Sequence, residues 1–189
     1  PFPGVLGRCC HHPCEKECTR GQVDDPISIA AMKRFAADHG GRYLPETPEP
    51  APRREERVAI VGAGPGGLTA AYRLALMGFG CTVFERLPVA GGMLAVGIPE
   101  YRLPREVLRH EIAEIERLGV EIRTGVEVGK DLTLDDLRAE GYAAILLAVG
   151  GHKQRALNVP GEGLEGVLEG VAMLRHHALG EPLELGEHV

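Results

Sequence analysis

The pattern of apolar and polar residues is clearest between Val58 and Glu85. Four consecutive segments fit a strand, a glycine-rich turn, a helix and a strand, in that order: 58–61, 62–67, 68–77 and 81–85. A further helix is expected from Pro104, and its apolar residues Leu108, Ile112 and Ile115 share one face. Its charged residues, Glu111 among them, are therefore expected on the outer face.

The second half of the chain continues this alternation. Two short strands and a helix are expected next, at 120–123, 125–128 and 132–139. The continuous apolar run at 142–149 predicts a parallel strand that is buried on both faces. It ends at Gly150, at the edge of the sheet where doubly wound folds bind ligands. Strands that alternate with helices predict an α/β fold, in which a parallel sheet carries helices on both faces.

The turn at 62–67 has the Gly-x-Gly-x-x-Gly spacing of a dinucleotide-binding motif. Gly62 allows the chain to turn sharply out of the strand, Gly64 leaves room for a pyrophosphate, and Gly67 lets the helix pack closely on the sheet. The start of that helix directs free N–H groups at the same point. Glu85, at the end of the second strand, can accept hydrogen bonds from ribose hydroxyls. Together these features predict a dinucleotide-binding crevice.

The first 41 residues differ from the rest and are expected to form a separate helical unit that is rich in cysteine. Asp25 and Pro26 fit the start of a helix whose apolar face includes Phe35. Closely spaced prolines then favour an extended linker. The predicted organisation therefore has three parts: 1–41, 42–57 and 58–189.

Composition excludes two classes of function. The formal net charge is −6 at pH 7, so the chain lacks the basic surface that binds nucleic acid. No apolar run is long enough to span a bilayer, so membrane insertion is not expected.

Four of the five cysteines lie between Cys9 and Cys18. Such clustering in a chain without signs of secretion indicates metal or redox chemistry rather than a disulfide framework. Cys10, Cys14 and Cys18 have the regular spacing of iron–sulfur ligands. A zinc site completed by a neighbouring histidine, or free thiols in a small helical segment, are the alternatives.

The remaining cysteine and most histidines show no such pattern. Cys81 falls in a predicted core strand, where a buried and inert thiol is expected. The histidines outside the cysteine-rich segment, including His152, are expected to be solvated.

Taken together, these motifs resemble the small, NADPH-oxidising subunit of glutamate synthase and its relatives, which include the amino-terminal half of dihydropyrimidine dehydrogenase. The resemblance covers essentially the whole chain. The matching segments are 7–18, 58–67, 85–94, 97–104 and 148–150. The Gly-Ile-Pro-Glu-Tyr-Arg-Leu-Pro sequence at 97–104 is the most specific of them, because a generic dinucleotide-binding fold does not require it.

The resemblance implies a Rossmann-like domain that binds FAD. It assigns the pyrophosphate to the residues of the glycine turn, Gly62, Gly64, Pro65, Gly66 and Gly67, and the adenosine ribose to Glu85. It places seven further residues along the cofactor: Arg86, Gly92, Met93, Leu94, Arg102, Val128 and Gly150. Because the flavin carries the chemistry, no catalytic side chain is expected.

The resemblance also implies a 4Fe-4S cluster bound by Cys10, Cys14 and Cys18. It leaves the fourth ligand open, since Leu6 stands where some relatives have cysteine and Lys33 where some have glutamine or glutamate. In this family a second cysteine-rich segment precedes the matching part, and a nicotinamide-binding motif and a closing FAD segment follow it. The chain is therefore expected to be a portion of a longer subunit, with an incomplete FAD domain.

The expected function is electron transfer in the cytoplasm. NAD(P)H reduces FAD in the full-length protein, and iron–sulfur clusters pass the electrons to a larger catalytic or electron-accepting subunit. Two alternatives remain open: an NAD-binding dehydrogenase domain with a zinc-binding appendage, and a non-catalytic docking module.

Overall fold

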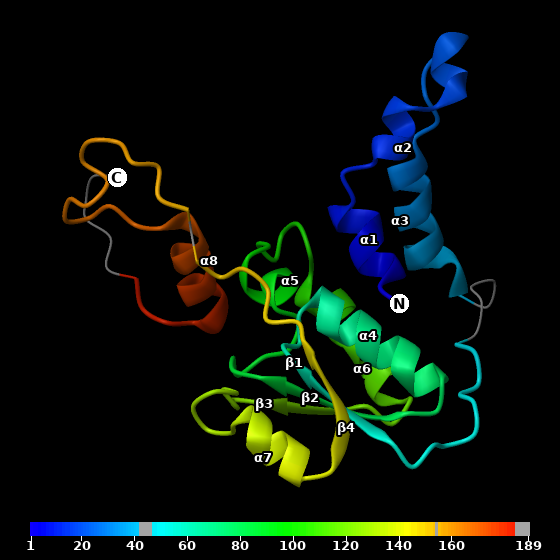
Figure 1. The fold of residues 1–189 in the computed structure, drawn as a ribbon. Coiled ribbons are helices and arrows are strands. Elements are labelled where there is room, and N and C mark those ends of the chain that lie inside the picture. The colour runs from blue at the N-terminus through cyan, green and yellow to red at the C-terminus, as the bar shows by residue number, and fades with distance from the viewer. Residues whose placement is uncertain (42–46, 154, 184–189) are drawn as a thin grey trace.

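A parallel sheet of four strands forms the centre of the structure, a computed structural model that describes residues 1–41, 47–153 and 155–183 (Figure 1). The strands are β1 (Arg57–Val61), β2 (Gly80–Glu85), β3 (Glu121–Thr124) and β4 (Tyr142–Leu147). Their order across the sheet is β3-β2-β1-β4, and each adjacent pair is parallel. The sheet therefore confirms the predicted parallel topology.

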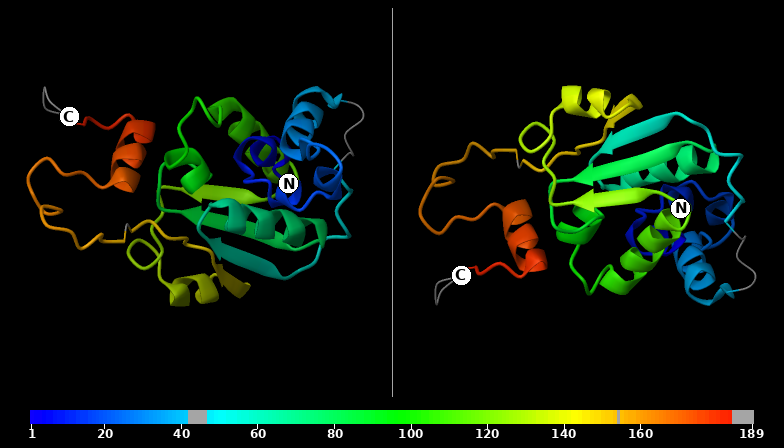
Figure 2. Two further views of the ribbon diagram at one scale, coloured as in Figure 1. Left: turned by 90° about the horizontal axis from the view of Figure 1, so that it is seen from above. Right: turned by 90° about the horizontal axis from the view of Figure 1, so that it is seen from below.

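Helices cover both faces of the sheet, as the alternation predicted (Figure 2). The helices that follow the first strand are α4 (Pro65–Leu76), α5 (Met93–Val96), α6 (Arg105–Glu116), α7 (Leu134–Ala139) and α8 (Gly170–Leu179). Helices α4 and α6 pack on one face, α7 packs on the other, and α8 lies beside α5. Across the described residues, each helix is too short or too polar to cross a membrane.

Alternating residues of the central strands supply two separate cores. Ile60 and Val83 pack in the cluster that contains α4 and α6, whereas Val61 and Phe84 pack in the cluster that contains α7. Successive side chains of a strand point to opposite faces, so β1 and β2 are buried from both sides. The apolar face predicted for α6 is also buried: Leu108, Ile112 and Ile115.

Two expectations about strands are wrong. The run at 142–149 forms β4, but β4 is the edge strand of the described sheet and pairs only with β1. Leu146 and Leu147 are 39% and 60% exposed, because no described element covers that part of the strand. The expected strand at 125–128 does not form and makes only one isolated bridge, between Val128 and Leu132.

The cysteine-rich part of the chain is helical, as predicted. It contains α1 (Pro3–Cys9), α2 (Pro13–Lys16), the 3-10 helix η1 (Thr19–Gln22) and α3 (Ile29–His39). Helix α3 begins after Ser28 rather than after Asp25, and Phe35 is 67% exposed, so its predicted start and apolar face are wrong. The face that meets α1 instead includes Arg34, whose backbone approaches Gly7.

Helix α1 joins the core of the following domain, which differs from the separate unit expected for 1–41. Phe2 and Val5 belong to the same buried cluster as Leu108 of α6. Glu111, expected on the outer face of α6, is buried against the start of α1. Part of the predicted linker, 42–46, lies outside the described residues; 47–56 have no regular secondary structure, and Arg57 already belongs to β1.

Close packing at Gly67 can be tested by substitution. A Cβ atom there would collide with the carbonyl oxygen of Gly62, whereas a Cβ at Gly66 would meet no atom within 4 Å. We expect Gly67→Ala to lower the free energy of unfolding by about 1–3 kcal/mol, because α4 must move off the sheet. Gly66→Ala is the control and should change it by less than about 0.5 kcal/mol in chemical denaturation. Equal effects of the two substitutions would contradict this packing.

Candidate functional site

A cavity of about 830 Å³ opens at the carboxyl ends of β1, β2 and β4. Most of the residues predicted to bind the cofactor line it: Gly62, Gly64, Pro65, Gly66, Glu85, Arg86, Gly92, Met93, Val128 and Gly150. They come from separate stretches of the chain, which the parallel topology brings to one edge of the sheet. Doubly wound folds bind ligands at this edge.

The glycine turn keeps this edge free of side chains. Gly62 has a φ of 108°, a conformation that favours glycine, and a Cβ there would collide with the backbone of Ala148. A Cβ at Gly66 would meet no atom within 4 Å, and one at Gly64 would meet only the Cα of Gly92, at 4.0 Å. The N-cap of α4 is Gly64, so no capping side chain occupies the first N–H groups of the helix. Those groups can bind an anionic pyrophosphate.

Glu85 is fixed in the wall of the cavity. It is 5% exposed, and its two oxygens accept backbone N–H bonds from Ala63 at 2.8 Å and from Leu87 at 2.9 Å. Each carboxylate oxygen has two acceptor positions, so one on each oxygen is left for a ligand. A bare glycine turn, open N–H groups and a fixed carboxylate together fit a dinucleotide with a diphosphate and ribose hydroxyls.

His152 also lines the cavity, which sequence reasoning missed. Its Nδ1 is buried without a hydrogen-bond partner among the described residues, so the expectation of a solvated side chain is wrong. Burial lowers the pKa of His152, and the positive charge of Arg86 acts in the same direction. A neutral imidazole therefore faces the cavity at physiological pH. The available signal was its position two residues after Gly150, at the end of β4.

Three predicted residues do not line the cavity. Gly67 serves the close packing of α4 on the sheet, which is the role the motif assigned to it. Leu94 packs against the core, and its carbonyl oxygen accepts a hydrogen bond from Arg105 at 3.0 Å. Arg102 is exposed outside the cavity. Contacts of Leu94 and Arg102 with FAD therefore stay predictions.

The three cysteines predicted to bind a cluster lie on successive short elements. Cys10 follows α1, Cys14 lies in α2 and Cys18 precedes η1. Within the described ranges, no three potential ligands lie close enough together to hold a metal ion. Convergence of these thiols on one cluster therefore stays a prediction.

The surroundings of two of these thiols, Cys10 and Cys18, nevertheless suit thiolate ligands. A backbone N–H bond from His12 to the Cys10 sulfur, 3.4 Å long, lowers the pKa of Cys10, and Lys33 adds to the effect. Backbone N–H bonds from Ile27 and Arg20 lower the pKa of Cys18. Thiolates are the form that binds iron–sulfur clusters.

Fold and site together define a dinucleotide-binding oxidoreductase with a thiol-rich helical segment. Residues 56–187 match the family model described as pyridine nucleotide-disulphide oxidoreductase, so the chain belongs to that family. Residues 1–43 match the model described as dihydropyrimidine dehydrogenase domain II, 4Fe-4S cluster. The first match implies binding of FAD and NAD(P), and the second implies a 4Fe-4S cluster rather than zinc.

Curated relatives and solved structures agree with this assignment. The chain is 44% identical to NADPH-Fe(3+) oxidoreductase subunit beta of Geobacter sulfurreducens, over 100% of this chain and 29% of the relative. It is 47% identical to NADP(+)-dependent formate dehydrogenase subunit beta of Moorella thermoacetica, over 91% of this chain and 28% of the relative. Mycobacterium tuberculosis FprA superposes with a TM-score of 0.57 at 26% identity, over 65% of this chain and 29% of that one. The chain thus spans less than a third of the length of these relatives.

In the chain without a bound cluster, thiol reactivity should distinguish the buried Cys81 from Cys10 and Cys18. Burial raises the pKa of Cys81 to about 11, so only about a thousandth of it is thiolate at a pH of about 8. Cys10 and Cys18 have lowered pKa values and should be alkylated by iodoacetamide much faster. Labelling of Cys81 should rise about tenfold per pH unit until it approaches its pKa. Mass spectrometry of the alkylated peptides measures this, and equal labelling at neutral pH would contradict it.

Proposed function

We propose that this chain is the FAD-binding and cluster-bearing portion of a longer subunit that oxidises NAD(P)H and passes the electrons to a partner. The observation that carries the proposal is the crevice in which the glycine turn, the open start of α4 and Glu85 meet. The thiol-rich segment is packed against the same domain through α1, which supports a path for electrons between the two.

The chain's own residues would bind and orient the cofactor. N–H groups at the start of α4, near Gly66, would hold the diphosphate, and the free acceptor positions of Glu85 would hold the adenosine ribose. Gly92 and Met93 would lie along the flavin side, where the lack of a side chain at Gly92 permits close approach. Bound FAD would supply the conversion of hydride transfer into single-electron transfer.

The cysteine-rich segment is the basis for proposing a partner subunit. Cys10, Cys14 and Cys18 would hold a 4Fe-4S cluster that carries electrons to a larger catalytic or electron-accepting subunit. All described cysteines are free thiols, which suits a reducing compartment, and a cytoplasmic location is part of the proposal. A more specific form of the proposal is that the subunit donates electrons in the same way as the small subunit of glutamate synthase. The motif at 97–104 supports this form.

Cofactor content of the full-length protein tests the proposal. After anaerobic purification it should contain iron and show flavin absorption bands at about 450 nm. Glu85→Gln should weaken FAD binding about 10- to 100-fold, because one acceptor for the ribose becomes an amide donor. Equilibrium dialysis of FAD against the deflavinated protein measures the affinity.

Glu140→Gln is the matched control, since Glu140 is exposed at the end of α7 and does not line the cavity. It should leave the affinity for FAD unchanged. A full-length protein without flavin bands, or an equal effect of both substitutions, would contradict the proposed site.

A further inference from the structure

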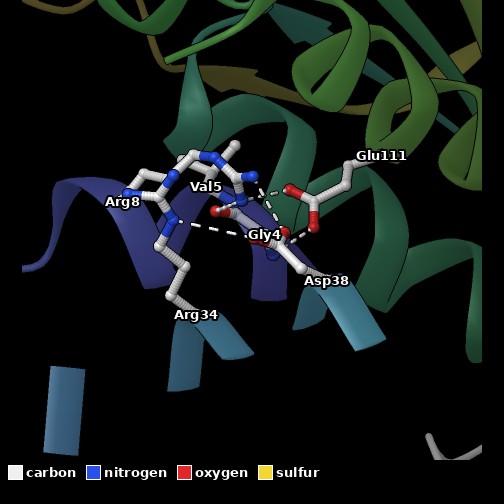
Figure 3. Close-up of polar contacts among 6 residues, drawn as sticks. All are labelled: Gly4, Val5, Arg8, Arg34, Asp38 and Glu111. Carbon is white, nitrogen blue, oxygen red and sulfur yellow. Dashed lines mark hydrogen bonds and ion pairs between the residues drawn. The ribbon is translucent and has the colours of Figure 1, made fainter. Parts of the chain in front are cut away.

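A carboxylate on the nucleotide-binding domain caps the first helix of the cysteine-rich segment (Figure 3). Glu111 of α6 is 7% exposed, and its two oxygens accept the backbone N–H groups of Gly4 at 2.5 Å and Val5 at 3.1 Å. Phe2, which precedes α1, has no hydrogen-bonding side chain of its own. Glu111 therefore satisfies donors at the helix start that would otherwise be buried without partners.

Helix α1 is packed tightly between two other helices. A Cβ at Gly4 would lie 2.9 Å from a methyl group of Val107 on α6, and a Cβ at Gly7 would lie 2.7 Å from the Cα of Arg34 on α3. Backbone contacts of this kind leave little room for sliding. The position of α6 therefore fixes the position of α1 and, through it, that of the rest of the cysteine-rich segment.

One ion pair joins α1 to α3, and a second lies within α3 on the same carboxylate. Arg8 contacts Asp38 of α3 at 2.8 Å, and Arg34 contacts the other oxygen of Asp38 at 3.6 Å (Figure 3). The Arg8–Asp38 pair therefore links α1 to α3, and among the described residues the polar contact of these two helices with α6 is made by Glu111.

Helix α6 is also attached to the wall of the dinucleotide crevice. The guanidinium of Arg105, in its first turn, donates to the carbonyl oxygens of Leu94 at 3.0 Å and Ile98 at 2.9 Å. These residues follow Gly92 and Met93, which line the cavity. At the other end of α1, Cys9 packs against the core and is followed directly by Cys10. One helix therefore contacts both the crevice wall and the helix that leads to the thiols.

We propose that Glu111 is a positioning residue, which holds the cysteine-rich segment at a set distance from the dinucleotide crevice and so sets the rate of electron transfer between them. This inference rests on the proposed function. In that step reduced FAD would give up two electrons and two protons; the electrons would pass one at a time through the cluster to the partner subunit, and the protons would pass to water.

The experiment uses the full-length holoenzyme and follows the two halves of the reaction separately. Stopped-flow absorbance reports flavin reduction by NAD(P)H, and freeze-quench electron paramagnetic resonance reports cluster reduction. Glu111→Ala should slow cluster reduction about tenfold or more, because small displacements of reacting groups are costly, and should leave flavin reduction unchanged. Glu111→Gln should have an intermediate effect, since its amide oxygen can still accept one N–H bond.

Glu116→Gln is the control, because Glu116 is exposed on the same helix. Amide hydrogen exchange provides the second measurement: residues 4–9 should exchange faster in Glu111→Ala, while 58–61 stay protected. If Glu111→Ala does not fold, Glu111→Gln is used instead, because it keeps the side-chain volume. Its rates of flavin and cluster reduction are then compared with those of the wild type.

Three results would overturn the inference. Cluster reduction at the wild-type rate in the Glu111 variants would show that Glu111 does not set the rate of electron transfer. Unchanged amide exchange of residues 4–9 would show that Glu111 does not hold α1 in place. An equal slowing in Glu116→Gln would remove the specific role of Glu111. A wild-type protein without flavin bands is a different failure, visible before any variant is made, and it removes the proposed function as well.

Discussion

The close approach of α4 to the end of β1 is the constraint on which the rest of the site depends. It requires hydrogen in place of a side chain at Gly67, since a Cβ there would collide with the carbonyl oxygen of Gly62. Gly62 itself must be glycine for another reason, because its Cβ would collide with the backbone of Ala148, which follows β4. Because the helix starts directly at the end of the strand, its first N–H groups point into the space above the sheet. Glu85 lies beside the same space because β2 pairs with β1 in parallel register, so that both strands end at the same edge of the sheet.

The cysteine-rich segment is part of the same folded body. Its first helix contributes Phe2 and Val5 to the main core, and Glu111 satisfies buried N–H donors that α1 cannot satisfy itself. Burial raises the pKa of Glu111, whereas the two N–H bonds act in the opposite direction. The two N–H bonds therefore offset part of the cost of burying this carboxyl group.

The end of β4 is apolar and exposed in the described sheet. Leu146 and Leu147 are apolar residues on an edge strand, although their sequence is typical of a strand in the interior of a sheet. The composition of β4 is thus typical of a buried strand, whereas its place at the edge of the described sheet leaves these residues exposed.

Local sequence determined β1, β2, the glycine turn and most of the crevice, because those features depend on short runs of apolar residues and on positions that only glycine can occupy. Leu108, Ile112 and Ile115 were likewise placed correctly by helical spacing. Only the tertiary structure decided the roles of Glu111 and His152. Their surroundings are made by segments distant in the sequence, α1 for Glu111 and the walls of the cavity for His152. Periodicity assigns a charged residue to solvent, whereas a buried partner that supplies unsatisfied N–H groups reverses that assignment.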